Sequence, residues 1–175
     1  RRPPGSTLFP YTTRFRSQAL ADLYTIHHEL GGVDGKTIGV VGRLEHRNVS
    51  ALLKGLAMFD DVTVMLVPFS GQVPDEVVSY CEENGVTVQA HRDIDSLSQA
   101  DAIYLNGPRT VAHAQLLRSR NSGHLKIDAE FMSRLKDDCI VMDPMQRSGD
   151  FSIEVQDPRL AFYRQAENAL FVRMA

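Results

Sequence analysis

The sequence predicts an α/β fold, namely a doubly wound parallel sheet of about five strands with helices on both faces. Short runs of β-branched and other apolar residues recur along the chain, and segments with apolar residues at helical spacing lie between them. Gly, Pro, Asn or Asp marks most of the boundaries. Strands that are apolar on both faces and joined by helical crossovers form parallel sheets covered on both sides, and right-handed crossovers make such a sheet doubly wound.

The expected elements alternate in order from residue 18. The first is a helix over Gln18–Leu30, ended by Gly31 and Gly32, whose apolar face holds Leu20, Leu23, Tyr24, Ile26 and Leu30. The apolar run KTIGVVG is the first strand, and the other expected strands cover residues 62–68, 86–91, 100–106 and 139–144. The helices between and after them are expected over residues 49–59, 74–84, 93–99, 128–136 and 158–170.

Residues 1–17 differ from the rest of the chain. They show neither helical nor strand periodicity and are expected to be disordered. The stretch TLFPYTTRFRS closely resembles the conceptual translation of a sequencing-adapter oligonucleotide, so we interpret residues 1–17 as an assembly or cloning artefact. The alternative is a natural basic tail that contains proline. Residues 18–175 are expected to form one domain, because the chain is too short for two of ordinary size.

Composition excludes several classes of protein. The net charge of −3 is spread along the chain, so neither nucleic acid nor a membrane is an expected partner. Cys81 and Cys139 belong to no metal-binding or redox spacing, which is typical of reduced, structural thiols in a cytoplasmic protein. No apolar run approaches the roughly 20 residues that span a bilayer. The six histidines show no ligand spacing, so no metal site is assigned, and no Ser, His and carboxylate set indicates a nucleophilic triad.

Function should lie in the loops beyond the carboxyl ends of the strands, where open parallel sheets bind ligands. These loops are residues 42–48, 68–72, 91–93, 106–109 and 143–147. The loop GRLEHRN lacks the glycine spacing of a dinucleotide-binding turn and the lysine motif of a P-loop. The polar connection over residues 110–127, rich in Arg, Ser, Asn and Gly, has the composition of a mobile active-site loop.

Two of these loops contain candidate binding residues. Arg47 lies close to a helix N-terminus, where a guanidinium and free backbone N–H groups together bind a carboxylate or phosphate; the alternative is an exposed arginine paired with Glu45. In MDPMQR, Pro144 stiffens the turn after the last strand, which leaves the carbonyls of Pro144 and Met145 free to face the cleft while Arg147 anchors the loop. A purely structural turn is the alternative.

Several segments together resemble the aspartate carbamoyltransferases (aspartate transcarbamylases), specifically the C-terminal, aspartate-binding domain of their catalytic chain. AFYRQAENALFVRMA is similar to the family's C-terminal helix, and QALADLYTIHHELGGVDGKTIGVVG is similar to the helix that crosses between the family's two domains together with the strand after it. The resemblance covers residues 18–175 in order. It implies transfer of a carbamoyl group from carbamoyl phosphate to the amine of L-aspartate, in pyrimidine biosynthesis, with no metal or organic cofactor.

The resemblance also implies which residues contact substrate. Arg47 matches an arginine that holds an aspartate carboxylate, with Asn48 in place of the usual threonine. MDPMQR matches the family's HPLPR turn, whose backbone carbonyls orient the carbamoyl group and the attacking amine; it keeps Pro144 and Arg147 but places Asp143, Met145 and Gln146 where His, Leu and Pro are expected. The family's TRxQ pattern, which clamps the second carboxylate, is replaced by Asn106, Gly107, Pro108 and Arg109, so the clamp position is glycine and Arg109 is the candidate substitute.

The partners that the resemblance implies are L-aspartate or a related amino acid, carbamoyl phosphate bound through an N-terminal domain, and two further copies in a homotrimer. A lysine and a serine of the neighbouring subunit also enter the family's site. The chain alone is therefore expected to be inactive, with no catalytic residue of its own. Two alternatives remain: a non-catalytic paralogue, and a carbamoyltransferase with a different amine acceptor.

Overall fold

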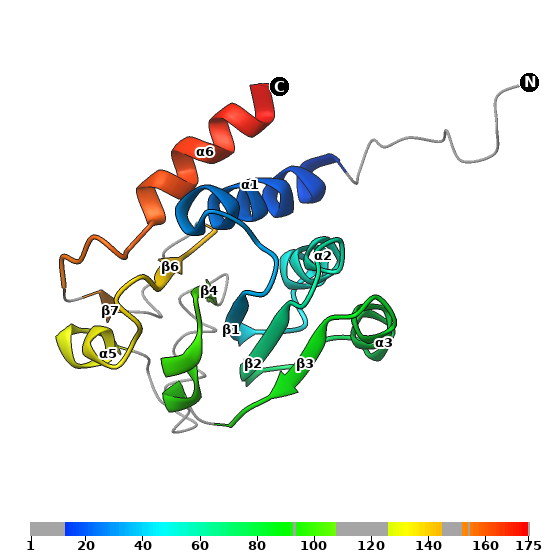
Figure 1. The fold of residues 1–175 in the computed structure, drawn as a ribbon, viewed down its shortest axis with the longest axis horizontal. Coiled ribbons are helices and arrows are strands. Elements are labelled where there is room, and N and C mark those ends of the chain that lie inside the picture. The colour runs from blue at the N-terminus through cyan, green and yellow to red at the C-terminus, as the bar shows by residue number, and fades with distance from the viewer. Residues whose placement is uncertain (1–12, 93, 108–125, 145–151, 154, 175) are drawn as a thin grey trace, which may run out of the picture.

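Five parallel strands form the central sheet of the structure, a computed structural model that describes residues 13–92, 94–107, 126–144, 152–153 and 155–174. Their order across the sheet is β3-β2-β1-β4-β6, and every neighbouring pair is parallel. The strands are β1 (Thr37–Arg43), β2 (Thr63–Ser70), β3 (Thr87–Ala90), β4 (Ala102–Asn106) and β6 (Ile140–Met142). The expected doubly wound sheet is confirmed (Figure 1).

Helices cover both faces of this sheet, and they are α1 (Thr13–Leu30), α2 (Arg47–Leu56), α3 (Asp75–Glu83), the 3-10 helix η1 (Ile94–Gln99), α5 (Ala129–Ser133) and α6 (Phe162–Met174). Ile38 and Val40 of β1 pack into a core with residues of α1, α2 and α3. Val41 of the same strand faces the other way, into a second core with Leu97 of η1 and Phe131 of α5. The strict alternation along β1 produces the two cores, because successive strand side chains point to opposite faces.

A second, two-stranded parallel sheet, which the sequence did not predict, joins β5 (Lys126–Ile127) to β7 (Ser152–Ile153). These strands are too short for a period of two to be visible. Residues 126 and 127 belong to the connection expected to be a mobile loop, and the structure instead pairs them with β7. The preceding residues 110–125 lie outside the described part of the chain.

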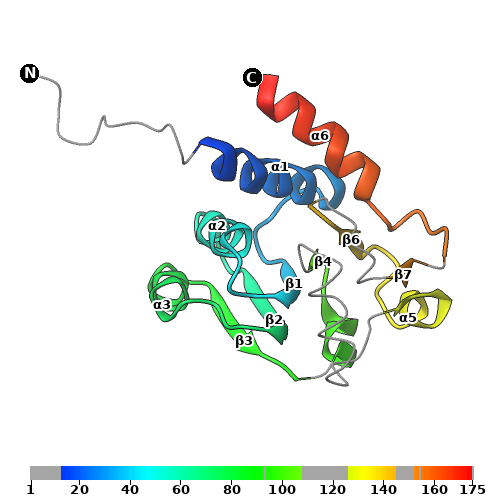
Figure 2. The same ribbon diagram turned by 180° about the vertical axis from the view of Figure 1, so that it is seen from behind.

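The first helix departs from expectation in two ways. It begins at Thr13, so residues 13–17 are helical and not disordered as predicted. Its buried face is also different: Leu20 and Tyr24, placed on the apolar face by spacing, are 56% and 42% exposed, whereas Asp22 is fully buried. Helix α1 packs against both α2 and α6, and these two contacts decide which of its side chains are buried (Figure 2).

The last helix also begins later than predicted, at Phe162 and not at residue 158. The intervening residues form an isolated parallel bridge to β6, between Leu160 and Val141. Arg159 is fixed there by Asp157, whose carboxylate accepts bonds from Arg159 Nε at 3.0 Å and from its terminal nitrogen at 2.7 Å. Pro158 therefore does not mark the first turn of this helix, because the chain pairs with the sheet before α6 begins.

The other boundary differences are local. Helix α2 starts at Arg47 and not Val49, because His46 caps it: His46 Nδ1 accepts the Asn48 N–H at 3.3 Å. Helix α5 is shorter than predicted, and Asp128 is its cap instead of its first residue, accepting the Phe131 N–H at 2.9 Å. No helix in the described residues is long and apolar enough to cross a bilayer.

Candidate functional site

The sheet changes winding direction between β1 and β4. The chain runs outward from β1 through β2 to β3, and then returns to the other side of β1 for β4 and β6. In open α/β sheets the crevice at this reversal, beyond the carboxyl ends of the strands, is where ligands bind. The carboxyl ends of β1 and β4 are paired through Gly42 and Asn106, so the loops that follow both strands border one crevice.

The end of β1 is fastened to the end of β4. Asn106 is 5% exposed, and its Nδ2 donates a hydrogen bond to the carbonyl oxygen of Arg43 at 2.6 Å. Gly42 has a φ of +115°, and a Cβ atom there would collide with the backbone oxygen of Asn106. Only glycine satisfies both the close approach and the positive φ. The paired ends of β1 and β4 therefore form a rigid base for the loops that follow them.

Glu45, in the loop after β1, contacts both the end of β1 and the residue that follows β2. Arg43 Nε donates to Glu45 Oε1 at 3.0 Å, with 17% of the arginine side chain and 38% of the glutamate side chain exposed. The Glu45 carboxylate also packs directly against Gly71, which has a φ of +65° and no room for a Cβ atom. Glu45 thus forms an ion pair with Arg43.

Arg47 is the first residue of α2 and is exposed. The positive end of the dipole of this ten-residue helix lies at this point, shortly after β1. Asn48 is half-buried beside it, with its N–H bonded to His46. This end of α2 combines a permanent positive charge with the positive end of the helix dipole, a combination suited to a carboxylate or phosphate.

The remaining candidates divide between described and undescribed residues. Gly107 follows β4 and is half-buried, and Pro144 follows β6 and is half-buried. Because β1, β4 and β6 are adjacent and parallel, Arg47, Gly107 and Pro144 lie at the same edge of the sheet. Arg109, Met145, Gln146 and Arg147 lie outside the residues that the structure describes.

The sequence reasoning missed the residues that hold the turn after β6. The Asp143 N–H donates to Gln165 Oε1 at 2.9 Å, and Gln165 Nε2 donates to Asp22 Oδ1 at 2.7 Å. In the structure both are polar residues on the buried sides of helices, since Asp22 is 0% and Gln165 2% exposed. Periodicity alone assigns such residues to the solvent face.

Neither cysteine resembles a reactive thiol. Burial raises the pKa of the Cys139 thiol to about 12, to which the nearby Asp101 adds, and burial likewise raises the pKa of Cys81. Both are free and buried, so they are protonated at neutral pH and act as small core side chains. Within the ranges that the structure covers, no three His, Cys, Asp or Glu side chains come together as a metal site.

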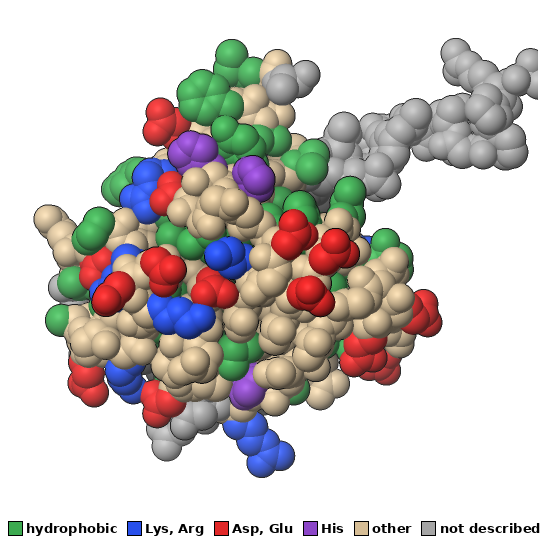
Figure 3. Space-filling model, viewed as in Figure 1, with side chains coloured by type: hydrophobic (Ala, Val, Ile, Leu, Met, Phe, Trp, Pro, Cys, Tyr) green, Lys and Arg blue, Asp and Glu red, His purple; other side chains and the backbone are tan. Residues whose placement is uncertain are grey.

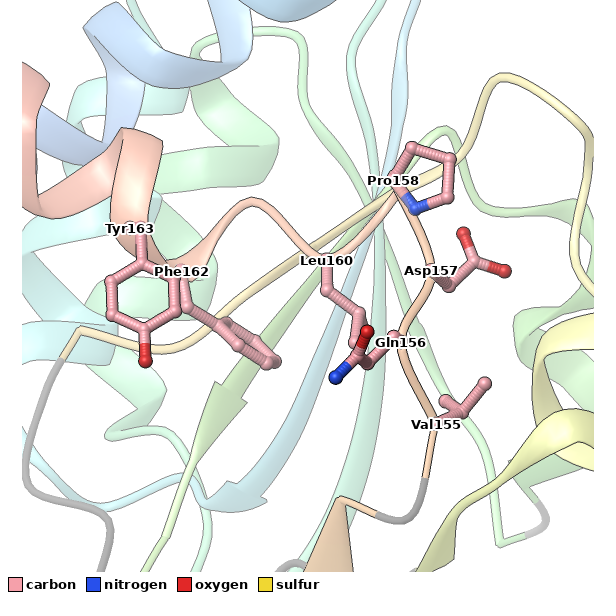
Figure 4. A pocket seen from close by; sticks show the side chains of 7 residues that line it. All are labelled: Val155, Gln156, Asp157, Pro158, Leu160, Phe162 and Tyr163. Carbon is pink, nitrogen blue, oxygen red and sulfur yellow. The ribbon is translucent and has the colours of Figure 1, made fainter.

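An open cavity of about 530 Å³ lies along the connection from β7 to α6. Figure 4 shows the side chains that line it, which are Val155, Gln156, Asp157, Pro158, Leu160, Phe162 and Tyr163. The rings of Phe162 and Tyr163 stand on one side of it, at the start of α6, and Val155 and Asp157 stand on the other. None of these lining residues belongs to the predicted set.

The winding reversal, the basic helix N-terminus and the braced loops define a doubly wound α/β ligand-binding domain. The sequence profile described as "Aspartate/ornithine carbamoyltransferase, Asp/Orn binding domain" matches residues 34–175. The chain therefore belongs to the aspartate/ornithine carbamoyltransferase family and comprises its Asp/Orn-binding domain.

Individual relatives agree with this assignment. The multifunctional protein pyr1-3 of Dictyostelium discoideum is 34% identical over 91% of the chain, which spans 7% of that protein. The chloroplastic aspartate carbamoyltransferase of Arabidopsis thaliana is 32% identical over 91% of the chain and 42% of its own length. The aspartate transcarbamoylase of Trypanosoma cruzi, solved with carbamoyl aspartate and phosphate, superposes with a TM-score of 0.79 at 34% identity, over 90% of the chain and 53% of that structure. The chain thus spans about half of the single-function relatives.

Proposed function

We propose that this chain is the amino-acid-binding half of an aspartate carbamoyltransferase, which converts carbamoyl phosphate and L-aspartate to N-carbamoyl-L-aspartate and phosphate in pyrimidine biosynthesis. The observation that carries the proposal is the position of Arg47. It is an exposed guanidinium at the N-terminus of α2, next to the crevice between β1 and β4, in a chain whose relatives are named as aspartate carbamoyltransferases.

In this proposal Arg47 and the N-terminus of α2 bind a carboxylate of aspartate, and Asn48 supports that end of the helix. The amine nitrogen of aspartate forms a bond to the carbamoyl carbon, the bond from that carbon to the phosphate oxygen breaks, and the amine loses a proton. Such a reaction depends on holding two substrates in the right geometry and on donors placed for the developing oxyanion. The carbonyls of Pro144 and Met145, with Gln146 and Arg147 completing the turn, orient the carbamoyl group and the amine.

The groups that bind carbamoyl phosphate belong, in this proposal, to the other half of the protein and to a neighbouring subunit of a cytoplasmic homotrimer. No catalytic residue is assigned to the present chain. Some relatives, in Arabidopsis and pea, are chloroplastic enzymes. The cytoplasmic location is therefore proposed for this chain and does not extend to those relatives.

One observation favours a second candidate, a carbamoyltransferase with a different amine acceptor. Gly107 stands where the resemblance expects the arginine that clamps the second carboxylate, and it offers no side chain. Unless Arg109 supplies that contact, an acceptor with a single carboxylate fits the site better than aspartate does.

The test is an assay of carbamoyl transfer by the complete protein, in which this chain is continuous with its carbamoyl-phosphate half. Aspartate and a panel of amino acids with one carboxylate serve as acceptors. Carbamoyl-aspartate as the main product supports the proposal, and a preference for another acceptor supports the second candidate. No product with any acceptor, from a folded trimer, would show a non-catalytic paralogue. The 175-residue chain alone is the control, and we expect it to form no product above background.

A further inference from the structure

A cluster of buried polar side chains lies between α1, α6 and the sheet. It consists of Asp22, Thr25, Tyr104, Gln165 and Asn168, all of which are at most 9% exposed. Burying polar groups is costly unless hydrogen bonds replace those made with water. None of these residues has a place in the proposed chemistry. One member of the cluster nevertheless contacts the turn that carries Pro144, through the backbone of Asp143.

The reason for this contact lies in how the sheet ends beside β6. Val141 N–H donates to the carbonyl oxygen of Arg159 at 2.8 Å, and Ala161 N–H donates to the carbonyl oxygen of Val141 at 2.9 Å. If this parallel ladder continued, the Asp143 N–H would donate to the carbonyl oxygen of Ala161. That oxygen instead accepts the Gln165 N–H at 2.7 Å, because α6 has begun. The Gln165 side chain replaces the missing ladder bond, because its Oε1 accepts the Asp143 N–H at 2.9 Å.

Asp22 fixes the orientation of that side chain. Its Oδ1 accepts bonds from Gln165 Nε2 at 2.7 Å and from Gln18 Nε2 at 2.8 Å. A backbone N–H only donates and a carboxylate only accepts, so one of the two amide orientations satisfies both neighbours of Gln165 and the other satisfies neither. Burial raises the pKa of Asp22 to about 6, although the bonds from Gln165 and Gln18 oppose the rise. Asp22 is therefore an ionised acceptor at neutral pH.

We infer that Gln165 and Asp22 are positioning residues for the turn after β6: Gln165 holds the backbone of Asp143, and Asp22 holds Gln165, so that the carbonyl of Pro144 is fixed at the carboxyl edge of the sheet. The inference rests on the proposed function, which assigns that carbonyl to the substrates. Both side chains are buried, so in this inference they act on the substrates only through the backbone of Asp143.

The test compares Gln165→Leu with Asn168→Leu in the complete protein. Asn168 is the matched control, because it lies one helical turn further along α6 and donates to Thr25 Oγ1 of α1 at 3.1 Å, across the same helix pair, without contacting β6. We expect Gln165→Leu to lower kcat about ten- to hundred-fold, as small misplacements of reacting groups do. Asn168→Leu should lower the melting temperature by a similar amount and leave kcat within about twofold. Equal effects of the two variants on kcat, or a wild-type kcat in Gln165→Leu, would overturn the inference.

A conservative variant provides a second test in case Gln165→Leu does not fold. Asp22→Asn keeps an oxygen that can accept from Gln165, so it should retain kcat within about threefold at pH 8. A protonated Asp22 also keeps one accepting oxygen, so protonation of Asp22 as the pH drops through about 6 should not by itself lower the wild-type kcat. The ionisable groups facing Asp22 are Arg173 of α6 and Tyr104 of β4, and burial raises the pKa of Tyr104 well above its usual value. Asp22→Leu removes the accepting oxygen and should lower kcat as Gln165→Leu does, and equal kcat values in Asp22→Leu and Asp22→Asn would overturn the role of Asp22.

Failure of the proposed function is distinguishable from failure of this inference. If the wild-type protein transfers no carbamoyl group, hydrogen exchange of the Asp143 amide still measures the positioning contact directly. At least tenfold faster exchange in Gln165→Leu than in Asn168→Leu supports the inference, and equal exchange in the two variants overturns it.

Discussion

The side-chain amide of Asn106 donates a 2.6 Å hydrogen bond to the carbonyl oxygen of Arg43, which joins the end of β4 to the end of β1. These residues lie 63 positions apart in sequence, on the two strands where the sheet reverses its winding. The base of the crevice is therefore held by a side-chain amide bonded to a backbone carbonyl, and the close approach of the two strands depends on the absence of a side chain at Gly42.

Gly42→Ala should destabilise the chain by at least about 2 kcal/mol, because an L side chain at a φ of +115° is strained and its Cβ would meet the backbone of Asn106. Gly85→Ala is the matched control: Gly85 has a φ of +83°, but no atom lies within 4 Å of a Cβ placed there. It should cost only the conformational strain, about 1 kcal/mol. Chemical denaturation of both variants measures the difference, and equal losses would show that the close approach to Asn106 is unimportant.

Arg47→Ala in the complete protein should reduce kcat/KM for the acceptor by about 2 to 5 kcal/mol of transition-state stabilisation, because a substrate carboxylate would lose its charged partner. The melting temperature should change little, since Arg47 is exposed. Arg47→Lys should recover little activity, because an ammonium group cannot form the two parallel bonds of a guanidinium. The same substitution at Arg109 decides whether that residue replaces the missing clamp. Wild-type acceptor kinetics in Arg47→Ala would refute the assignment.

The outer surfaces of α1 and α6 carry large apolar side chains, and hydrophobic groups gather over these helices in Figure 3. Leu170, Phe171 and Met174 are 57%, 56% and 74% exposed, and Leu20 of α1 is 56% exposed. Adjacent exposed apolar groups favour association. We expect the 175-residue chain to self-associate at high concentration, and Leu170→Ser with Phe171→Ser to weaken this. A monomeric wild-type chain in sedimentation at the same concentration would contradict the prediction.

Asp22 should make the chain less stable as the pH rises from about 4 to about 6. Its pKa is about 6 in the folded chain, raised mainly by burial, and its ordinary value is 3.8. Within this window the folded chain holds a proton that the unfolded chain has released, so the free energy of unfolding falls with rising pH. The loss is on the order of 3 kcal/mol if the whole shift is expressed. Denaturation of Asp22→Asn at pH 4.5 and pH 7 should lack this component.

Asp157 provides a control of opposite sign. Its hydrogen bonds with Arg159 lower its pKa in the folded chain, so its contribution is present above the ordinary aspartate pKa and is lost as the pH falls through the lowered value. Asp157→Asn should therefore cost about 1 to 2 kcal/mol at pH 7. The difference from the wild type should disappear in strong acid. A constant difference at all pH values would show that the charge of Asp157 is irrelevant.

The sequence was sufficient for the main sheet because its strands carry a strong local signal. The five expected strands occur in the expected order, since apolar, β-branched runs such as that around Val40 are buried on both faces. Helix ends were less predictable because tertiary pairing decides them, as the bridge between Leu160 and Val141 shows. For the site, the loops could be located from strand ends, and Arg47 is indeed at a helix N-terminus. Gln165 and Asp22 could not be found, because their partners are distant in sequence.

The pairing of Asp22 with Gln165 spans 143 residues, and so does the bond from Asn168 to Thr25. Bringing the first and last helices together closes a long loop, which costs more conformational entropy than pairing neighbouring strands. It is therefore expected to be slower than strand pairing. The junction should therefore form late on the folding pathway, after β1 and β2 have paired. Substitutions in it should accelerate unfolding more than they retard folding. The α1–α6 junction therefore sets how slowly the folded domain opens.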